Sequence, residues 1–327
     1  MKAWLCERFA DPFELVQKEV PLPQPGPGEV RVRVRAAGLA FGETLVLEGG
    51  YQKLPPLPYI PSSELSGIVD ACGPGVTRLR VGDRVAAFSV SLAGGGLAEY
   101  CVLPERFVHP VGDGIDLVDA AGFLMNHWTA FNALVRRAQL LEGETLVVFG
   151  ATGGVGCAAM DVGRALGARV IAVGSDTGYL KAMGADLAID YRQASVSEQV
   201  REFTGGRGAD VYFDPVGGDL FDQAMKAIAP GGRILVVGFT SGRPATLRTN
   251  VALVKMISVI GVEARLAIEQ TGEQGWADFN TMLTWAKIGK IRPQKANRFP
   301  FDDALQAFRD LRNRKVRGKC VVVIDTD

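Results

Sequence analysis

The sequence predicts an α/β protein with two domains, one built on an antiparallel, barrel-like set of strands and one on a doubly wound parallel sheet. Three observations lead to this prediction. The chain has 327 residues, a length that suits two hydrophobic cores better than one. Its first third holds short β-type runs separated by turn residues. From about residue 116, longer helical segments lead into a regular alternation of apolar strands and helices.

The expected barrel-like domain begins with three strands. Glu29–Ala36 alternates Val with Arg, which is typical of a strand with one buried face, and Ser66–Ala71 and Val81–Phe88 are further β-type runs. The proline-rich segment Pro21–Gly28 is short, and the strand after it continues the same pattern. We therefore expect this segment to be a loop within the domain and not a boundary.

The second domain is predicted from short, continuous apolar runs, as expected for parallel strands that are covered on both faces. These runs are Leu146–Phe149, Val170–Val173, Val211–Phe213 and Ile234–Val237. Between the first two, Val155, Ala159, Val162 and Leu166 fall on one face of a helix. Strand, helix and strand in this order indicate a βαβ unit.

The alternation of strands and helices ends after the apolar run Ile257–Val262. This run is far shorter than a membrane-spanning helix and is expected to be a buried strand. Two helix-like stretches follow, Trp276–Ile288 and Asp302–Arg312, and Lys319–Ile324 has the pattern of a closing strand.

The composition argues against nucleic acid and membranes as partners. Lys plus Arg and Asp plus Glu each total 36, so no net charge attracts a polyanion. Glu7, Arg8 and Asp11 interrupt the start of the chain, which therefore lacks the apolar core of a secretory signal. The five cysteines show no zinc or redox spacing, and we expect reduced thiols in a cytoplasmic protein. The only two histidines, His109 and His127, cannot complete a common zinc set and are expected to be structural.

A glycine-rich segment between the first parallel strand and the following helix has the context of a dinucleotide-binding fingerprint. Its residues are Gly150, Ala151, Thr152, Gly153, Gly154, Val155 and Gly156. Gly153 would let the backbone approach a pyrophosphate, Gly156 would permit close packing of helix on strand, and the amides at the helix start would bind the anion. Ala151 stands where the common fingerprint has its first glycine. The alternative is a glycine-rich turn without a ligand.

The residues at the end of the second parallel strand favour NADPH over NADH. An acidic residue at this place binds the ribose hydroxyls of NADH and repels a 2'-phosphate, but here Val173 is followed by Gly174. Candidate donors to the phosphate are Ser175, Thr177, Tyr191 and Arg192. Two alternatives stay open: Asp176 replaces the missing acid and favours NADH, or Arg192 is only a surface charge.

Six motifs occur in the order seen in the medium-chain dehydrogenases and reductases, and together they span nearly the whole chain. They are Pro61–Gly67, Val81–Val85, Gly96–Tyr100, Trp128–Ala130, the glycine-rich segment and Gly318–Lys319. The sequence most resembles the quinone oxidoreductase branch, which includes zeta-crystallin. Phe41–Glu43 and Gly50–Pro56 further resemble the vesicle amine transport protein homologues within that branch.

This resemblance implies the type and the boundaries of both domains. A Rossmann domain is expected over residues 122–261. Residues 1–121 and 262–327 are expected to form a discontinuous, GroES-like barrel domain that carries the catalytic site. The resemblance also implies a homodimer that acts on a small molecule.

The resemblance further implies that the protein holds no metal. In the zinc alcohol dehydrogenases of this superfamily, the catalytic ligands would lie at the positions matched to Ala40, Ser63 and Met125. None of these side chains binds zinc well, and residues 90–115 hold a single cysteine where a structural zinc needs a cluster.

Several side chains are implied to lie at the substrate or the nicotinamide. Tyr51 either donates its hydroxyl to the substrate or packs on the proline-rich loop Leu54–Pro58. Many quinone oxidoreductases have an asparagine where this chain has Ala40, and Asn126 either replaces that polar contact or caps a helix. The residues matched to contacts along the nicotinamide half are Phe41, Thr129, Gly238, Phe239 and Thr240.

Without a metal, the protein would have to polarise its substrate through hydrogen bonds, which suits quinones and α,β-unsaturated carbonyls better than simple alcohols. The sequence therefore predicts an NADPH-dependent reductase of quinones or other conjugated carbonyls. One alternative is a reductase of enals, enones or enoyl thioesters, for which Lys53, Arg265 and Arg298 are candidate contacts to coenzyme A phosphates. The other is a non-catalytic NADPH-binding protein similar to the lens crystallins of this branch.

Overall fold

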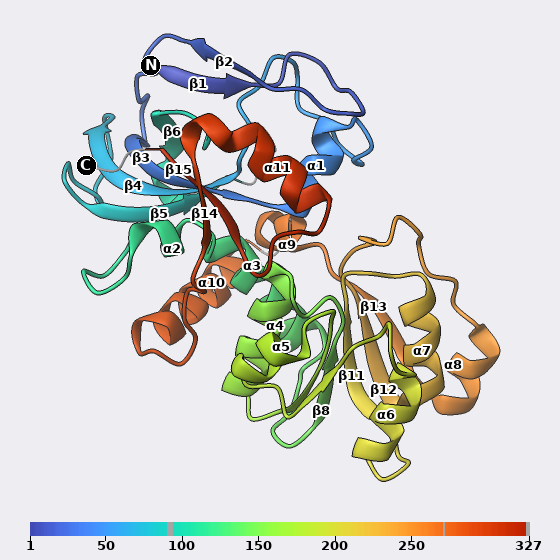
Figure 1. Ribbon diagram of the computed structural model, residues 1–327. Coiled ribbons are helices and arrows are strands. Elements are labelled where there is room, and N and C mark those ends of the chain that lie inside the picture. Colours follow the sequence, from blue (N-terminus) through green and yellow to red (C-terminus); the bar gives the residue numbers. More distant parts are fainter. Residues whose placement is uncertain (90–93, 271, 325–327) are drawn as a thin grey trace. The chain divides into compact units, whose positions relative to one another are not determined.

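In the computed structural model, which describes residues 1–89, 94–270 and 272–324, the chain divides into two compact units. The first, here called the barrel unit, consists of Met1–Met125 and Pro293–Asp327. The second, the sheet unit, consists of Asn126–Arg292. In Figure 1 the barrel unit begins in blue and returns in red, and the sheet unit runs from green to orange.

The barrel unit is built on a mostly antiparallel, seven-stranded sheet. Its strands follow the order β14, β15, β3, β4, β5 and β7, and β6 pairs with β3 away from this path. Their bounds are β3 (Glu29–Leu39), β4 (Glu64–Cys72), β5 (Arg84–Phe88), β6 (Tyr100–Pro104), β7 (Val108–Pro110), β14 (Asn297–Pro300) and β15 (Cys320–Val323). A separate two-stranded ribbon is formed by β1 (Lys2–Leu5) and β2 (Val16–Glu19).

The strands that the sequence predicts in the barrel unit are confirmed, but their boundaries shift: β3 ends at Leu39 and not at Ala36, and β4 spans Glu64–Cys72 and not Ser66–Ala71. In β3, Val30, Val32 and Val34 are fully buried, as the alternation with arginine predicted. The run that was expected to begin at Val81 becomes a strand only at Arg84. The reason is the turn before it, where Gly82 has a φ of +94°, a conformation that glycine adopts without strain.

Helices from both ends of the chain complete the core of the barrel unit. Its helical segments are α1 (Phe41–Leu47), α2 (Leu117–Ala120), α11 (Ala304–Arg312) and the short 3₁₀ helices Glu105–Phe107 and Phe301–Asp303. Leu39 and Leu47 share one apolar cluster with Phe308 and Val322, which come from the last elements of the chain. The expected discontinuous barrel therefore forms because the closing segment buries apolar surface of the opening one.

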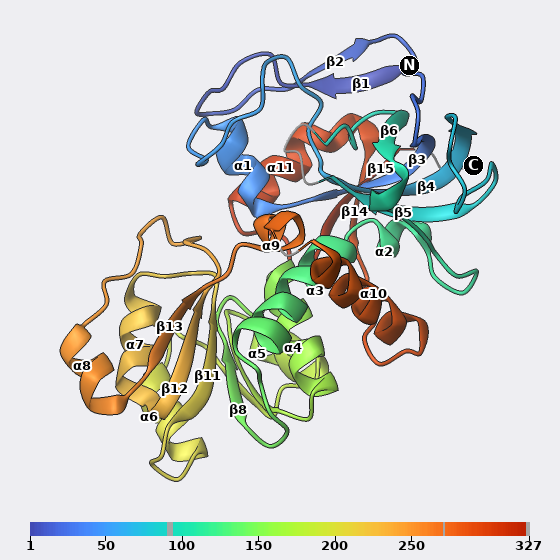
Figure 2. The same ribbon diagram turned by 180° about the vertical axis from the view of Figure 1, so that it is seen from behind.

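The sheet unit contains a six-stranded parallel sheet with the strand order of a Rossmann fold. The order is β10, β9, β8, β11, β12 and β13, which reads 3-2-1-4-5-6 when the strands are numbered within the unit. Their bounds are β8 (Thr145–Val148), β9 (Arg169–Val173), β10 (Leu187–Ile189), β11 (Ala209–Asp214), β12 (Ile228–Val236) and β13 (Ser258–Gly261). Figure 2 shows β8, β11, β12 and β13 side by side. Ligands of such sheets bind beyond the carboxyl ends of the strands, where the order reverses between β8 and β11.

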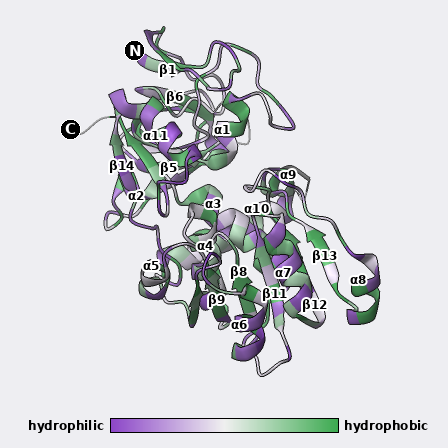
Figure 3. Cartoon of the chain, turned by 45° about the vertical axis from the view of Figure 1, so that its right-hand side comes forward, coloured by the Kyte–Doolittle hydropathy of each residue, from purple (hydrophilic) through white to green (hydrophobic). Residues whose placement is uncertain are grey.

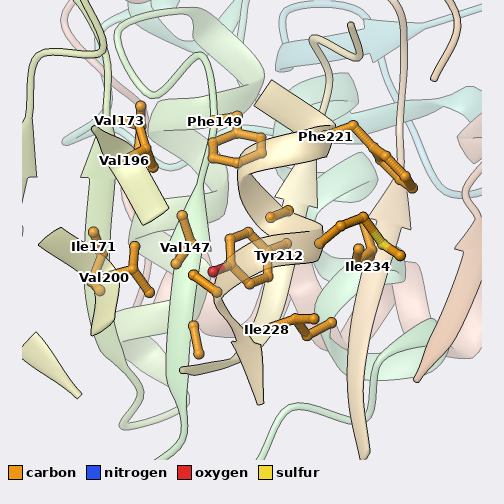
Figure 4. Close-up of a cluster of buried hydrophobic side chains, with 14 of the residues drawn as sticks. Val147, Phe149, Ile171, Val173, Val196, Val200, Tyr212, Phe221, Ile228 and Ile234 are labelled. Carbon is orange, nitrogen blue, oxygen red and sulfur yellow. The ribbon is translucent and has the colours of Figure 1, made fainter. Parts of the chain in front are cut away.

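Helices pack on both faces of the parallel sheet. The helical segments of the sheet unit are α3 (Leu124–Phe131), a π-helical segment Asn132–Arg137, α4 (Gly154–Ala165), α5 (Thr177–Ala182), α6 (Val196–Phe203), α7 (Asp219–Ala227), α8 (Thr249–Lys255), α9 (Ala264–Gln270) and α10 (Glu273–Lys287). Apolar side chains of α6 and α7 share one buried cluster with Val147, Phe149 and Tyr212 (Figure 4). Helix α4 packs on the other face, because a Cβ added at Gly163 would lie 2.5 Å from the side chain of Leu146.

The boundary between the units lies later in the chain than the sequence predicts. The division falls after Arg292, whereas the Rossmann domain was expected to end at residue 261. Helices α9 and α10 belong to the sheet unit because they pack on α3. The indole of Trp128 donates a 2.8 Å hydrogen bond to the carbonyl of Ala264, and its ring lies 5.6 Å from that of Phe279.

Hydropathy follows this architecture. Figure 3 shows β8 and β9 coloured mainly hydrophobic, as expected for strands that are buried on both faces. Within the described ranges, no helix is both long and apolar enough to cross a membrane.

Candidate active site

The glycine-rich segment forms a tight loop from the end of β8 to the start of α4. Gly150 has a φ of +57°, and the N–H of Gly153 donates a 2.9 Å hydrogen bond to its carbonyl. The N–H of Ala151 donates to the carbonyl of Val173 at the end of β9. The loop is therefore held by the two strands between which it lies.

Gly153 and Gly156 of this loop are glycines for different structural reasons. A Cβ at Gly156 would lie 2.4 Å from the carbonyl oxygen of Gly150, so only glycine permits this contact between helix and loop. A Cβ at Gly153 would meet no protein atom nearer than 3.4 Å, and its φ of −89° is open to any residue. Gly153 is the N-cap of α4 and offers no side-chain acceptor to the first amides of that helix. Space is therefore left open where helix amides can bind an anion.

The end of β9 has no room for an acidic side chain. Gly174 is buried, its N–H donates to the carbonyl of Ile189, and a Cβ there would lie 2.8 Å from the methyl group of Thr152. The absence of a carboxylate at this position, which the sequence analysis linked to NADPH, thus has a packing cause. Thr152 and Gly174 also join the glycine loop to the loop after β9.

The neighbouring acid, Asp176, caps a helix. It is the N-cap of α5, and its Oδ1 accepts a 3.0 Å hydrogen bond from the N–H of Tyr179. Thr177 is the first residue of that helix. One carboxylate oxygen of Asp176 is therefore committed to the helix, which argues against the alternative that it replaces the ribose-binding acid.

Arg192 is fixed beside Ser175. Its Nε donates to Asp190 Oδ1 at 2.9 Å, and its Nη2 donates to Asp190 Oδ2 at 2.6 Å and to the carbonyl of Ser175 at 2.8 Å. The hydrogen bonds from Arg192 lower the pKa of Asp190 to about 2. The structure thus brings Ser175 and Arg192 together, and Tyr191 next to them in the chain is 44% exposed.

A segment that the sequence analysis missed links the glycine loop to the end of β12. A Cβ at Gly150 would lie 3.2 Å from the Val216 side chain, and one at Gly238 would lie 3.3 Å from the carbonyl oxygen of Pro215. The N–H of Thr240 donates to the same carbonyl at 3.0 Å. The loops after β8, β11 and β12 therefore adjoin at one edge of the sheet.

The carboxylate of Asp214 shapes this missed segment. Its Oδ1 accepts hydrogen bonds of 2.8 Å from the N–H groups of Val216 and Gly217. Burial raises the pKa of Asp214, against those two hydrogen bonds, which lower it. A signal was present in the sequence, since Asp214–Gly218 directly follows a parallel strand and combines an acid, a proline and two glycines.

Two predicted site residues lie on α3, Asn126 as a candidate polar contact and Thr129 as a candidate contact of the nicotinamide half. Asn126 and Thr129 are three residues apart, so they share one face of the helix, and both are only partly buried. Because α3 begins at Leu124, Asn126 lies inside it, and the alternative that it is an N-cap is wrong. His127 is buried and its Nε2 lies 3.2 Å from Asp161 Oδ2 on α4, which agrees with a structural role.

The other two predicted site residues belong to the barrel unit, Phe41 to α1 and Tyr51 to the segment after this helix. Phe41 is the first residue of this helix, and the guanidinium of Arg312 lies 5.8 Å from the centre of its ring. Tyr51 is half-buried against the apolar cluster of α1 and α11, and a Cβ at Gly42 would lie 3.6 Å from its ring. Tyr51 therefore packs beside the helix that begins with Phe41.

The three positions matched to zinc ligands are held through their backbone by buried carboxylates. Glu43 accepts hydrogen bonds from the N–H groups of Ala40 at 3.0 Å and Ser63 at 2.7 Å. Glu64 accepts one from the N–H of Met125 at 2.6 Å. Among the residues that the structure describes, no group of three or more His, Cys, Asp or Glu side chains is placed to hold a metal ion.

A Rossmann sheet with a glycine loop at its carboxyl edge, in one chain with a GroES-like barrel, defines the class of two-domain nucleotide-dependent dehydrogenases. Residues 26–113 match the family described as the alcohol dehydrogenase GroES-like domain, and residues 154–286 match the family described as zinc-binding dehydrogenase.

The similarity extends over the whole chain. Quinone oxidoreductase-like protein 2 of Bos taurus is 34% identical over 326 residues, which cover 98% of this chain and 92% of that protein. A mycobacterial protein whose structure was determined with NADPH is 30% identical, with a TM-score of 0.88 and coverage of 99% and 100%. A structure described as an NAD-dependent alcohol dehydrogenase is 29% identical, with a TM-score of 0.90 and the same coverage. The chain belongs to the quinone oxidoreductase branch of the medium-chain dehydrogenase/reductase family.

Proposed function

We propose that the protein is an NADPH-dependent oxidoreductase that reduces quinones or other conjugated carbonyl compounds by hydride transfer without a metal ion. The observation that carries this proposal is the carboxyl edge of the parallel sheet. There the open N-terminus of α4, the buried Gly174 and the fixed guanidinium of Arg192 lie on adjoining loops. The chain belongs to an oxidoreductase family, and nucleotides bind at this edge in sheets of this type. Both observations support the same conclusion.

The residues at this edge fit a dinucleotide. The amides of the first turn of α4 are proposed to bind the pyrophosphate, because Gly153 leaves the space before them open. Gly238, Phe239 and Thr240 are proposed to lie along the nicotinamide half, and Phe239 is 40% exposed for such a contact. When bound, the nucleotide supplies the hydride from its nicotinamide ring.

The choice of NADPH over NADH rests on the surroundings of Arg192. An acid at position 174 would have to displace Thr152, and Asp176 is engaged in capping α5. Three donors of the guanidinium are used by Asp190 and Ser175. In the described part of the chain, no hydrogen bond involves its Nη1, which leaves two N–H donors for a 2'-phosphate.

The polarisation of the substrate is assigned to hydrogen-bond donors. Either the hydroxyl of Tyr51 in the barrel unit or the amide of Asn126 in the sheet unit is the proposed donor to the carbonyl oxygen, on which negative charge develops as the hydride arrives. Conjugation lowers the need for a Lewis acid, so quinones and enones suit such a site better than alcohols. Ala40 brings no polar group of its own.

This function is tested by following the oxidation of NADPH and of NADH with a quinone, an enone and a crotonyl thioester as acceptors. Turnover of the quinone or the enone, faster with NADPH, is the expected result. Faster turnover of the thioester would assign an enoyl-thioester reductase, and tight NADPH binding with no turnover would assign a non-catalytic, crystallin-like role. A protein that binds neither nucleotide would contradict the proposal.

A further inference from the structure

We propose that Glu43 is a positioning residue, whose carboxylate holds the backbone at Ala40 and Ser63 in the arrangement that the substrate end of the site needs. This inference rests on the proposed function, because it assigns to the barrel unit the ordering of the groups next to the reacting carbonyl. It gives a buried carboxylate the cross-linking role that a metal ion has in zinc-dependent relatives.

The two oxygens of Glu43 accept hydrogen bonds from two different segments of the chain. Oε2 accepts a 3.0 Å hydrogen bond from the N–H of Ala40, the N-cap of α1, which is ordinary capping by the third residue of a helix. Oε1 leaves the helix and accepts from both the N–H of Ser63 at 2.7 Å and its hydroxyl at 3.0 Å. One side chain therefore ties the start of α1 to the chain just before β4.

Glu43 and its partner Ser63 are both buried. Glu43 is 4% exposed and Ser63 is 3% exposed, so these hydrogen bonds form away from water. A buried carboxylate that loses a hydrogen-bond donor costs free energy, because water cannot replace that donor. The N–H and O–H groups that still donate to the carboxylate cannot turn to solvent either. The arrangement at Ala40 and Ser63 thus depends on Glu43 more strongly than a surface capping residue would allow.

A second carboxylate, that of Glu64, holds in the same way the third position matched to a zinc ligand, Met125. Glu64 accepts from the N–H of Met125, and its other oxygen is paired with Lys319, whose side chain is 4% exposed. A Cβ at Gly122 would lie 2.2 Å from the stem of Lys319, so a glycine makes room for this buried lysine. All three positions matched to metal ligands are therefore braced through their main chain.

The test compares Glu43→Gln with a matched control, Glu105→Gln. A glutamine has one acceptor oxygen and a donor NH₂ group, so it cannot serve the donors of both Ala40 and Ser63. Glu105 also accepts from backbone N–H groups of another segment of the barrel unit, those of Thr77, Arg78 and Leu79, but all three donate to its Oε1, so the one acceptor oxygen of a glutamine can keep these hydrogen bonds. The pair therefore separates the loss of a brace that needs both oxygens from the effect of a Glu→Gln change as such.

Three quantities are measured: amide hydrogen exchange, turnover, and the affinity for NADPH. In Glu43→Gln we expect faster exchange at Ala40 and Ser63, a fall in kcat of at least about tenfold and an NADPH affinity within about twofold of wild type. The control should match wild type in all three. Equal exchange and equal kcat in Glu43→Gln and the control would overturn the inference.

A further variant, Ser63→Ala, distinguishes positioning from direct proton transfer by the hydroxyl. It removes the O–H donor and keeps the backbone N–H, so we expect kcat to fall by less than about threefold. A loss as large as that of Glu43→Gln would show that the hydroxyl itself acts on the substrate and would overturn the positioning role. If the wild-type protein turns over no acceptor, the proposed function fails, and unchanged exchange in Glu43→Gln would then refute the brace separately.

Discussion

At the scale of single residues, the discrimination between nucleotides is assigned to Arg192. The substitution Arg192→Gln removes the charge and the two Nη1 N–H donors, which are not those that Asp190 and Ser175 accept from. We expect the affinity for NADPH to fall roughly tenfold or more and that for NADH to change by less than about threefold, since only NADPH carries the 2'-phosphate. Titration of NADPH and NADH fluorescence with the wild type and the variant measures both affinities. Equal losses of affinity for NADPH and NADH would show that Arg192 is only a surface charge.

A second residue, Tyr212, tests the packing of the sheet unit. It is fully buried on β11 among apolar side chains, with Val147 and Ile228 near it in Figure 4, and its hydroxyl has no hydrogen-bond partner in the described residues. A buried, unsatisfied hydroxyl is destabilising, so Tyr212→Phe should raise the free energy of unfolding by about 1 kcal/mol. Denaturant unfolding compares the two proteins. A loss of stability would reveal a partner for the hydroxyl, such as a buried water.

At the scale of elements, the local pattern of the sequence predicted most of the strands and the long helices. The runs at β8, β9, β11 and β12 were found because strands covered on both faces are continuously apolar. By contrast, β10 has three residues and β14 has four, of which none is buried in β14, so neither shows a pattern that a sequence alone can reveal. The place of α9 and α10 depends on contacts with Trp128, more than 130 residues earlier in the chain.

The candidate site was predictable where it depends on a contiguous motif and not where it depends on distant contacts. The glycine loop was recognised from its position between a strand and a helix. The brace was not, because Glu43 and Ser63 are 20 residues apart and nothing in the local sequence announces their hydrogen bonds. Asp214 was missed although its segment combines an acid, a proline and two glycines, because its hydrogen-bond partners are backbone N–H groups that carry no side-chain signature.

At this scale, the binding role of the glycine loop can be tested by the substitution Gly153→Val. Gly153→Val should fold with a melting temperature close to that of the wild type, because a Cβ there meets no close neighbour and φ is negative. The added side chain would occupy the space before the amides of α4, so the affinity for NADPH should fall at least about tenfold, or roughly 1.4 kcal/mol.

The matched control for this prediction is Gly156→Ala. Its Cβ would collide with the carbonyl of Gly150, so stability should fall by about 1 to 3 kcal/mol. Binding and melting curves of both variants are compared with wild type. A folded Gly153→Val protein with unchanged affinity would show that the loop is only a turn.

At the scale of the whole molecule, we propose that two copies associate through β13. This strand ends the sheet, and its sequence Ser258–Gly261 has neither the charge nor the proline that protects exposed edges. Beside it on the chain, Leu253, Val254 and Met256 are 79%, 80% and 73% exposed. A two-fold axis would pair the two β13 strands and cover these side chains.

Light scattering of the wild type and of the double variant Leu253→Glu, Val254→Glu tests this association. We expect a mass of twice that of the chain for the wild type and of one chain for the variant, which should stay folded because both side chains point to solvent. A monomeric wild type, or a variant that remains dimeric, would place the interface elsewhere or remove it.

The central claim is that this protein reduces conjugated carbonyls with NADPH and needs no metal. The measurement that tests it most directly is NADPH oxidation by a quinone and an enone, with protein whose zinc content has been determined and with a chelator present. We expect less than one tenth of a zinc per chain, turnover that the chelator leaves unchanged, and negligible oxidation of ethanol or benzyl alcohol, because Ala40, Ser63 and Met125 provide no ligand set. One bound zinc per chain, together with activity that the chelator abolishes, would contradict it.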